Sequence, residues 1–108
     1  MSGGGSSRDG GLPSGGTAAS PSCDELTFSA RLQSPQAGVV ALLSPGDELS
    51  IELTDDPVVQ AVSQHGLAGH ITKRLPDLIR CINLGQIYIA VVDLVDGGNV
   101  EVTVEPAS

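Results

Sequence analysis

The chain has 108 residues, a formal net charge of −8 and only two aromatic residues, Phe28 and Tyr88. This length suffices for one small domain, whose core must come from Val, Leu, Ile and Ala. The negative charge repels phosphate backbones at long range, and two cysteines are too few for a disulfide-built scaffold.

Residues 1–22 are rich in Gly and Ser and contain almost no large apolar side chain. Such a segment cannot bury enough surface to offset its chain entropy, so we expect a disordered tail. It lacks the basic start and the apolar run of a signal peptide, and no later stretch is apolar enough to cross a membrane. We therefore expect a soluble, cytoplasmic protein with a single domain over residues 23–108.

The first half of this domain predicts three strands and one short helix. Residues 25–33 alternate between apolar and polar side chains, which is typical of a half-buried strand. Ser34 and Pro35 then have the chemistry of an N-cap and a first helical residue, so a helix of one or two turns is expected. Two further strands follow at 49–54 and 58–63, joined by a short loop.

The next segment predicts a short strand followed by the main helix. Residues 67–71 form the strand, and Gly69 within it marks a bulge or a close backbone approach. The helix begins near 72–75 and has Pro76 in its first turn, where a missing N–H is tolerated. Gly85 is a natural residue just after a helix.

The last segment predicts a hairpin. Residues 87–95 are apolar on both faces, so we expect a central strand with one face in the barrel and the other against a helix. One face should carry Tyr88, Ala90, Val92 and Leu94, and the other Ile87, Ile89, Val91 and Val95 together with Asp93. A glycine-dependent turn at 96–99 then leads into 100–105, whose valines point inward.

Together these segments predict a mainly β fold. The expected architecture is a small five- or six-stranded antiparallel β-barrel, with one helix between the middle and final strands and a short helix after the first strand. An OB-like barrel and an SH3-like barrel both fit this order of elements.

Residues 68–95 resemble the second half of the HIRAN domain. The resemblance rests on Ala-Gly-His-Ile-Thr at 68–72, a helix with Ile79 and Ile82, then Gly85, and the strand Tyr-Ile-Ala-Val-Val. It implies a small β-barrel that binds DNA, often at single-stranded ends. Residues 43–53 depart from the first half of that family, so no DNA-contacting residue is carried over. The end of the chain also resembles small bacterial proteins, which implies no function.

The sequence indicates no catalytic, cofactor or metal site. His65 and His70 are the only histidines, and no Cys or carboxylate completes a set of metal ligands with them. An enzyme that uses Cys81 and His70 is one alternative, but Cys81 fits better as a small buried hydrophobe in the helix. Cys23 lies where the tail meets the domain, and the sequence leaves open whether it pairs with Cys81.

One group of cations stands out on this acidic domain. Lys73, Arg74 and Arg80 cluster at the main helix, and Arg31 is a potential fourth member. They form either a solvated helix face or a local anion or nucleic-acid contact near the start of the helix.

These observations favour a non-enzymatic, acidic β-barrel module that acts through protein contacts, with a protein partner or a second copy as its ligand. The expected contact surface is the exposed face of the last two strands or the edge of the 67–71 strand. The alternative is a HIRAN-like or OB-like nucleic-acid-binding domain. The net charge disfavours that alternative, so the cluster of Lys73, Arg74 and Arg80 would have to overcome it locally.

Overall fold

The structure, a computed structural model, describes residues 22–107. The expected disordered tail, residues 1–22, lies outside this range except for its last residue. In chain order the described elements are β1 (Phe28–Arg31), α1 (Ala37–Val40), β2 (Glu48–Leu53), β3 (Val59–Ser63), β4 (Gly66–Ile71), α2 (Leu75–Asn83), β5 (Tyr88–Asp96) and β6 (Asn99–Pro106).

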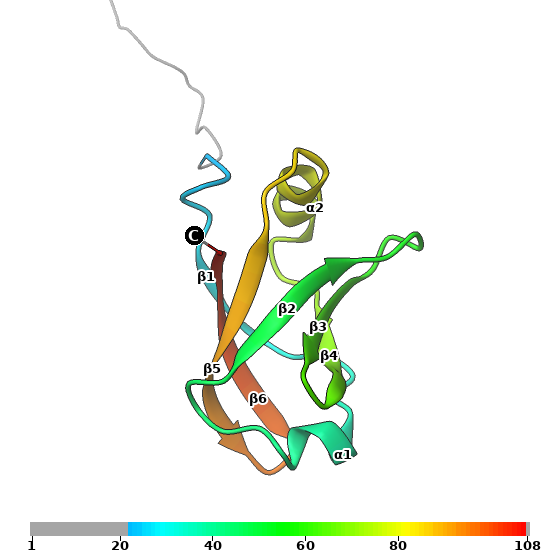
Figure 1. The fold of residues 1–108 in the computed structure, drawn as a ribbon, viewed down its shortest axis with the longest axis vertical. Helices are drawn as coiled ribbons and strands as arrows, with labels where there is room; N and C mark the ends of the chain where they lie inside the picture. Colours follow the sequence, from blue (N-terminus) through cyan, green and yellow to red (C-terminus); the bar gives the residue numbers. More distant parts are fainter. Residues whose placement is uncertain (1–21, 108) are drawn as a thin grey trace, which may run out of the picture.

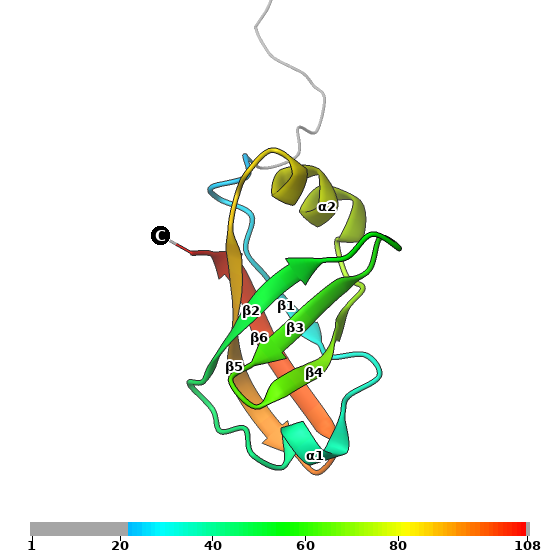
Figure 2. The ribbon, with the colours of Figure 1, turned by 45° about the vertical axis from the view of Figure 1, so that its right-hand side comes forward.

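All six strands belong to one antiparallel sheet with the order β1-β6-β5-β2-β3-β4. The sheet curls so that its two ends approach each other (Figure 1, Figure 2). Just after β1, the backbone of Gln33 exchanges two hydrogen bonds of 2.8 Å with His70 of β4. The predicted mainly β, antiparallel fold with five or six strands is confirmed with six strands and two helices, and the curled sheet is consistent with a small β-barrel.

The two helices lie at opposite ends of the curled sheet (Figure 1), with α1 beside the β5–β6 turn. Before α1, residues 33–36 run along the edge of β4, and the N–H of Gln36 donates to the carbonyl of Ala68 at 2.9 Å. The edge of β4 is one of the two expected contact surfaces. It is covered by the chain itself.

The interior is built from aliphatic side chains that alternate along the strands. Val100, Val102 and Val104 of β6 have no exposed surface, and Tyr88 of β5 is 1% exposed. Burial of such side chains is the main favourable contribution to folding, at about 25 cal/mol per Å² of apolar surface. The amphipathic helix α2 closes the core from one end with its buried Leu78 and Cys81.

The chain just after β1 approaches Gly69 so closely that a side chain there would be crowded. A Cβ atom placed there would lie 3.0 Å from both the carbonyl oxygen of Gln33 and the Cβ of Leu32. The pairing of β3 with β4 also shifts register beside it, between Ala61 and Val62. Both the bulge and the close approach that Gly69 predicted are confirmed, and they let the chain just after β1, at Leu32 and Gln33, lie against β4.

The predicted start of the short helix was wrong. Ser34 is not an N-cap, because it has a left-handed φ of +49° and lies outside the helix. Helix α1 begins at Ala37 with Gln36 as its N-cap. The physical reason is tertiary: Gln33 stays extended to pair with His70, and the chain must turn sharply at Ser34 before a helix can begin.

The prediction that Leu94 shares a face with Tyr88, Ala90 and Val92 was also wrong. The β5–β6 pairing shifts register between Val92 and Leu94, so Leu94 lies opposite Glu101 and is 46% exposed. The extra residue of the bulge is Asp93, whose carboxylate accepts a hydrogen bond from the Thr103 hydroxyl at 2.7 Å. A bulge inserts one residue without changing the apolar pattern around it, so alternation alone cannot place it.

The strand order confirms that β5 is central, between β6 and β2. We expected a helix to cover its other face, and this expectation was wrong. Ile87, just before β5, is 69% exposed, and Ile89 and Val91 are half-buried. Helix α2 instead lies at the end of the barrel (Figure 2).

Candidate functional site

Cys23 and Cys81 form a disulfide that ties the segment before β1 to α2. Their Cα atoms lie 5.4 Å apart although the residues are separated by 58 positions in the sequence. Cys81 is fully buried, as predicted, but its sulfur is part of a cross-link. The enzymatic alternative requires a free Cys81 thiol that His70 can activate. A sulfur in a disulfide cannot act as that nucleophile.

Tyr88 holds the same segment from the side of the barrel. Its hydroxyl donates a hydrogen bond of 2.6 Å to the carbonyl of Cys23. Burial raises the pKa of Tyr88 above its ordinary value of 10.0, an effect that Arg80 opposes and Asp24 reinforces. The neutral phenol is therefore the donor at physiological pH, and the segment before β1 has both a covalent and a polar anchor.

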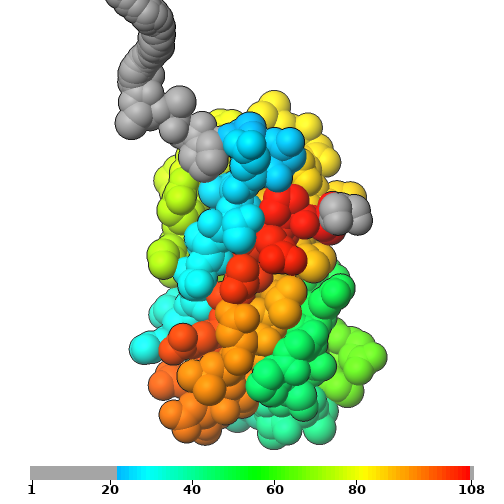
Figure 3. Space-filling model, turned by 90° about the vertical axis from the view of Figure 1, so that its left-hand side faces the viewer, coloured from blue at the N-terminus to red at the C-terminus, as the bar shows by residue number. Residues whose placement is uncertain are grey.

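A cleft of about 240 Å³ separates β1 from the segment that joins β4 to α2. We call it the β1 cleft. It exists because β4 ends at Ile71, and the chain then turns into α2 and leaves β1 without a neighbour on that side. Figure 3 shows β1 in cyan between β6 in orange-red and the yellow-green start of the α2 region. The cleft is lined by Ser29, Ala30, Arg31, Lys73 and Glu101.

The backbone of β1 presents hydrogen-bonding groups to this cleft. The N–H of Leu32 donates to Val100 of β6, so the neighbouring odd-numbered residues direct their backbone groups away from β6. Gln33 uses these groups to bind His70. The N–H groups of Ser29 and Arg31 therefore face away from β6, and within residues 22–107 no backbone hydrogen bond from outside the sheet ladder reaches them.

The four predicted cations do not form one patch. Arg31 and Lys73 are both exposed and border the β1 cleft, and neither makes an ion pair within the described range. Arg74 instead donates to the carboxylate of Asp77 at 2.8 Å. Arg80 lies near the disulfide, with Nη1 3.7 Å from the sulfur of Cys23. Of the four predicted cations, the structure therefore places only Arg31 and Lys73 at the same cleft.

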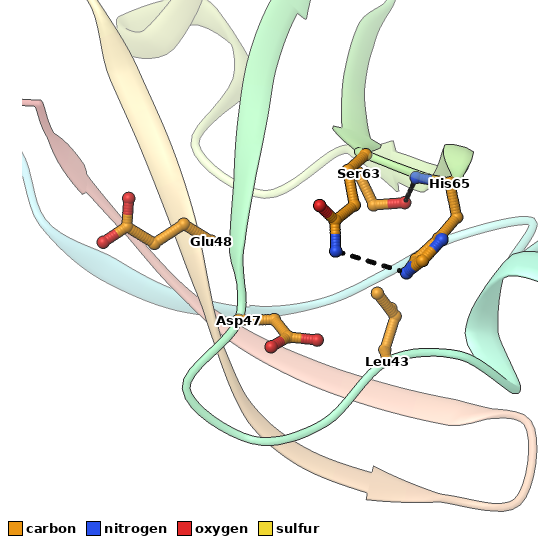
Figure 4. Close-up of a pocket in the computed structure, with 6 residues that line it drawn as sticks. Leu43, Asp47, Glu48, Ser63 and His65 are labelled. Carbon is orange, nitrogen blue, oxygen red and sulfur yellow. Dashed lines mark hydrogen bonds between the residues drawn. The ribbon is translucent and has the colours of Figure 1, made fainter.

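A second hollow, of about 210 Å³, lies between the loop before β2 and the β3–β4 turn (Figure 4). The polar side chains of Asp47 and Ser63 in this hollow make hydrogen bonds within the two turns. The carboxylate of Asp47 accepts the N–H of Ser44 at 2.9 Å, and the hydroxyl of Ser63 accepts the N–H of His65 at 2.9 Å. Glu48 points away from the other side chains in Figure 4. Among residues 22–107 no group of three or more His, Cys, Asp or Glu is arranged to hold a metal ion.

Two large apolar side chains project from the turn between α2 and β5. Leu84 is 71% exposed and Ile87 is 69% exposed, and they lie on either side of Gly85. The carbonyl of Ile87 accepts a hydrogen bond of 2.9 Å from the N–H of Ala107, which fixes the end of β6 beside the same turn. We call Leu84 and Ile87 the apolar turn, and large apolar side chains exposed to solvent are candidates for a contact surface.

Comparisons of this chain with protein families, with curated proteins and with solved structures gave no match. The HIRAN resemblance therefore stays a prediction. A separate search of the described residues found no helix long and apolar enough to cross a membrane.

Sequence reasoning missed the β1 cleft and left the disulfide open. The cleft depends on where β4 leaves the sheet, and no local pattern encodes that point relative to β1. The disulfide had one signal, since Cys23 and Cys81 are the only cysteines of the chain.

Proposed function

We propose that this chain is a non-enzymatic, acidic β-barrel module that acts by binding another protein. The observation that supports the proposal best is the apolar turn, in which Leu84 and Ile87 are exposed on a hydrogen-bonded connection between α2 and β5. The charge of −8 supports protein over phosphate ligands. Both aromatic rings are buried, which leaves no described aromatic platform on which bases could stack.

The proposal includes an OB-like barrel. Strands β2 to β6 with α2 inserted between β4 and β5 have the element order of a five-stranded OB barrel. Strand β1 is then an addition that lies beside β6 at the end of the sheet. An SH3-like barrel remains the alternative type.

The test compares three affinity-tagged proteins: wild type, the double variant L84S/I87S, and the control L42S. The control removes a leucine that is 56% exposed in the loop after α1, at the opposite end of the curled sheet from α2 (Figure 1). After chemical cross-linking in cells, we expect one partner in stoichiometric amount with wild type and control, and a loss of at least tenfold with L84S/I87S. Equal recovery from all three proteins, or no partner at all, contradicts the proposal. Sedimentation velocity on the same proteins identifies a second copy as the partner.

Nucleic-acid binding is the second candidate function, supported by the approach of Arg31 and Lys73 at the β1 cleft. Two phosphate contacts give a salt slope of roughly −1.4 in log K for a single strand. A titration with labelled single-stranded DNA at about 50 mM salt should then show binding that R31A/K73A abolishes. Absence of binding at that salt removes this candidate.

The expected cytoplasmic location and the disulfide predict different redox states. A reducing cytosol keeps most thiols free, whereas oxidising compartments preserve disulfides. In a cytoplasmic protein we therefore expect Cys23 and Cys81 to be largely reduced. Trapping free thiols with a maleimide in intact cells, followed by mass spectrometry, measures this fraction, and a fully oxidised pair contradicts the cytoplasmic proposal.

A further inference from the structure

The β1 cleft lies where the sheet lacks a strand. At Gln33 the two ends of the curled sheet are joined, because His70 of β4 pairs there with the chain after β1. One residue later β4 ends, and the edge of β1 continues alone beside the segment that leads to α2. The N–H groups of Ser29 and Arg31 lie on this edge with the same orientation that Gln33 uses to bind His70.

An extended chain placed in the cleft would occupy the position beside β1 that β4 occupies beside Gln33. It would run antiparallel to β1, as β4 does at Gln33, and would pair its backbone with Ser29 and Arg31. Addition of a strand to an open sheet edge is a recurring mode of peptide recognition, in which backbone hydrogen bonds supply affinity and neighbouring side chains supply specificity. Unprotected edges of this kind also favour pairing with another chain.

The charges at the cleft indicate the chemistry of the added strand. Arg31 and Lys73 border the cleft from its two sides, and neither has an ion-pair partner within residues 22–107. Glu101 lies opposite Arg31 in the β1–β6 register and leaves one net positive charge. A carboxylate on the incoming strand would meet both cations at once.

The same two cations also suit a phosphate backbone, but the remaining features favour a peptide. The ligand must offer backbone donors and acceptors at strand spacing to Ser29 and Arg31, which a polypeptide does. The cleft has no aromatic side chain on which a base could stack.

We propose that the β1 cleft binds an extended peptide by strand addition to β1, with an Asp or Glu side chain of the peptide placed between Arg31 and Lys73. This inference rests on the proposed protein-binding function, but it uses a surface separate from the apolar turn.

The test begins with a displayed library of random seven-residue peptides, selected on the oxidised full-length chain and counter-selected on R31A/K73A. Enriched peptides should carry at least one Asp or Glu and should bind wild type about tenfold more tightly than R31A/K73A. The R74A variant, which removes a cation already bonded to Asp77, should bind within about twofold of wild type. Selection without enrichment, or enrichment of peptides without acidic residues, overturns the proposal.

Backbone methylation of the best peptide then tests strand addition without altering the protein. N-methyl groups at alternate residues that face β1 should abolish binding, whereas the same groups at the intervening residues should change it by less than about threefold. Equal effects of the two patterns exclude strand pairing.

The outcomes also separate this inference from the proposed function. If the partner depends on Leu84 and Ile87 while the library yields nothing, the strand-addition proposal alone falls. If labelled single-stranded DNA binds in a manner that depends on Arg31 and Lys73 and no peptide is enriched, the cleft is a nucleic-acid site and the peptide proposal is wrong.

Discussion

Removal of the Cys23–Cys81 disulfide should strongly destabilise this small domain. A cross-link restricts the unfolded chain, and the entropy it removes grows with the logarithm of the loop it closes. The two cysteines are separated by 58 residues, for which the chain-entropy relation gives about 4 kcal/mol at 25 °C. Since small domains are stable by only about 5–15 kcal/mol, this is a large share of the total.

The perturbation is the double variant C23A/C81A, compared with wild type in urea and followed by far-UV circular dichroism. With a denaturant slope of about 1.5 kcal/mol per M, the expected loss moves the unfolding midpoint down by roughly 3 M. Wild type with an excess of dithiol reductant should reach the same midpoint by an independent route.

The single variants C23A and C81A provide the control. Each breaks the same covalent bond, so each should lose nearly as much stability as the double variant if the cross-link itself is responsible. C81A also removes a fully buried sulfur atom, so any extra loss in C81A measures packing. A shift below about 1 kcal/mol in the double variant and on reduction would refute the reasoning. It would show that the burial of Leu26, which is 1% exposed, and the hydrogen bond from Tyr88 to Cys23 suffice to hold the segment.

Three further predictions concern the barrel. Tyr88 is the only tyrosine, and its pKa is raised in the folded protein. Its absorbance near 295 nm should therefore titrate above pH 10.0 in buffer and near 10 in urea, and the free energy of unfolding should fall as pH rises through this range; a folded-state pKa below 10 contradicts this. Gly69→Ala should cost roughly 1–3 kcal/mol in urea unfolding, because its Cβ would meet the backbone of Gln33 at 3.0 Å; a neutral variant shows that β1 and β4 can separate at no cost. Val92→Ala should cost about 2 kcal/mol and Leu94→Ala less than about 0.5 kcal/mol, since Val92 is 1% and Leu94 46% exposed; the reverse order contradicts the bulge at Asp93.

The candidate site could be predicted only in part from the sequence, because its residues come from segments that are distant in the chain. The sequence named Arg31 and Lys73 among four cations, but it could not show that β1 and the start of α2 border one cleft. It could not show either that Arg74 is bonded to Asp77. These facts depend on which chain segments the curled sheet brings together, 42 positions apart in the case of the cleft.

Features with a short-range cause followed from the sequence by itself. The limits of α2 reflect Pro76 in the first turn and Gly85 after the last, and the inward valines of β6 reflect a two-residue period. The register of the sheet, the bulge that turns Leu94 outward and the disulfide were decided only by the tertiary structure. Each of them depends on the relative position of distant segments, and the free energy that fixes that position comes from the shared core, which no local stretch of residues contains.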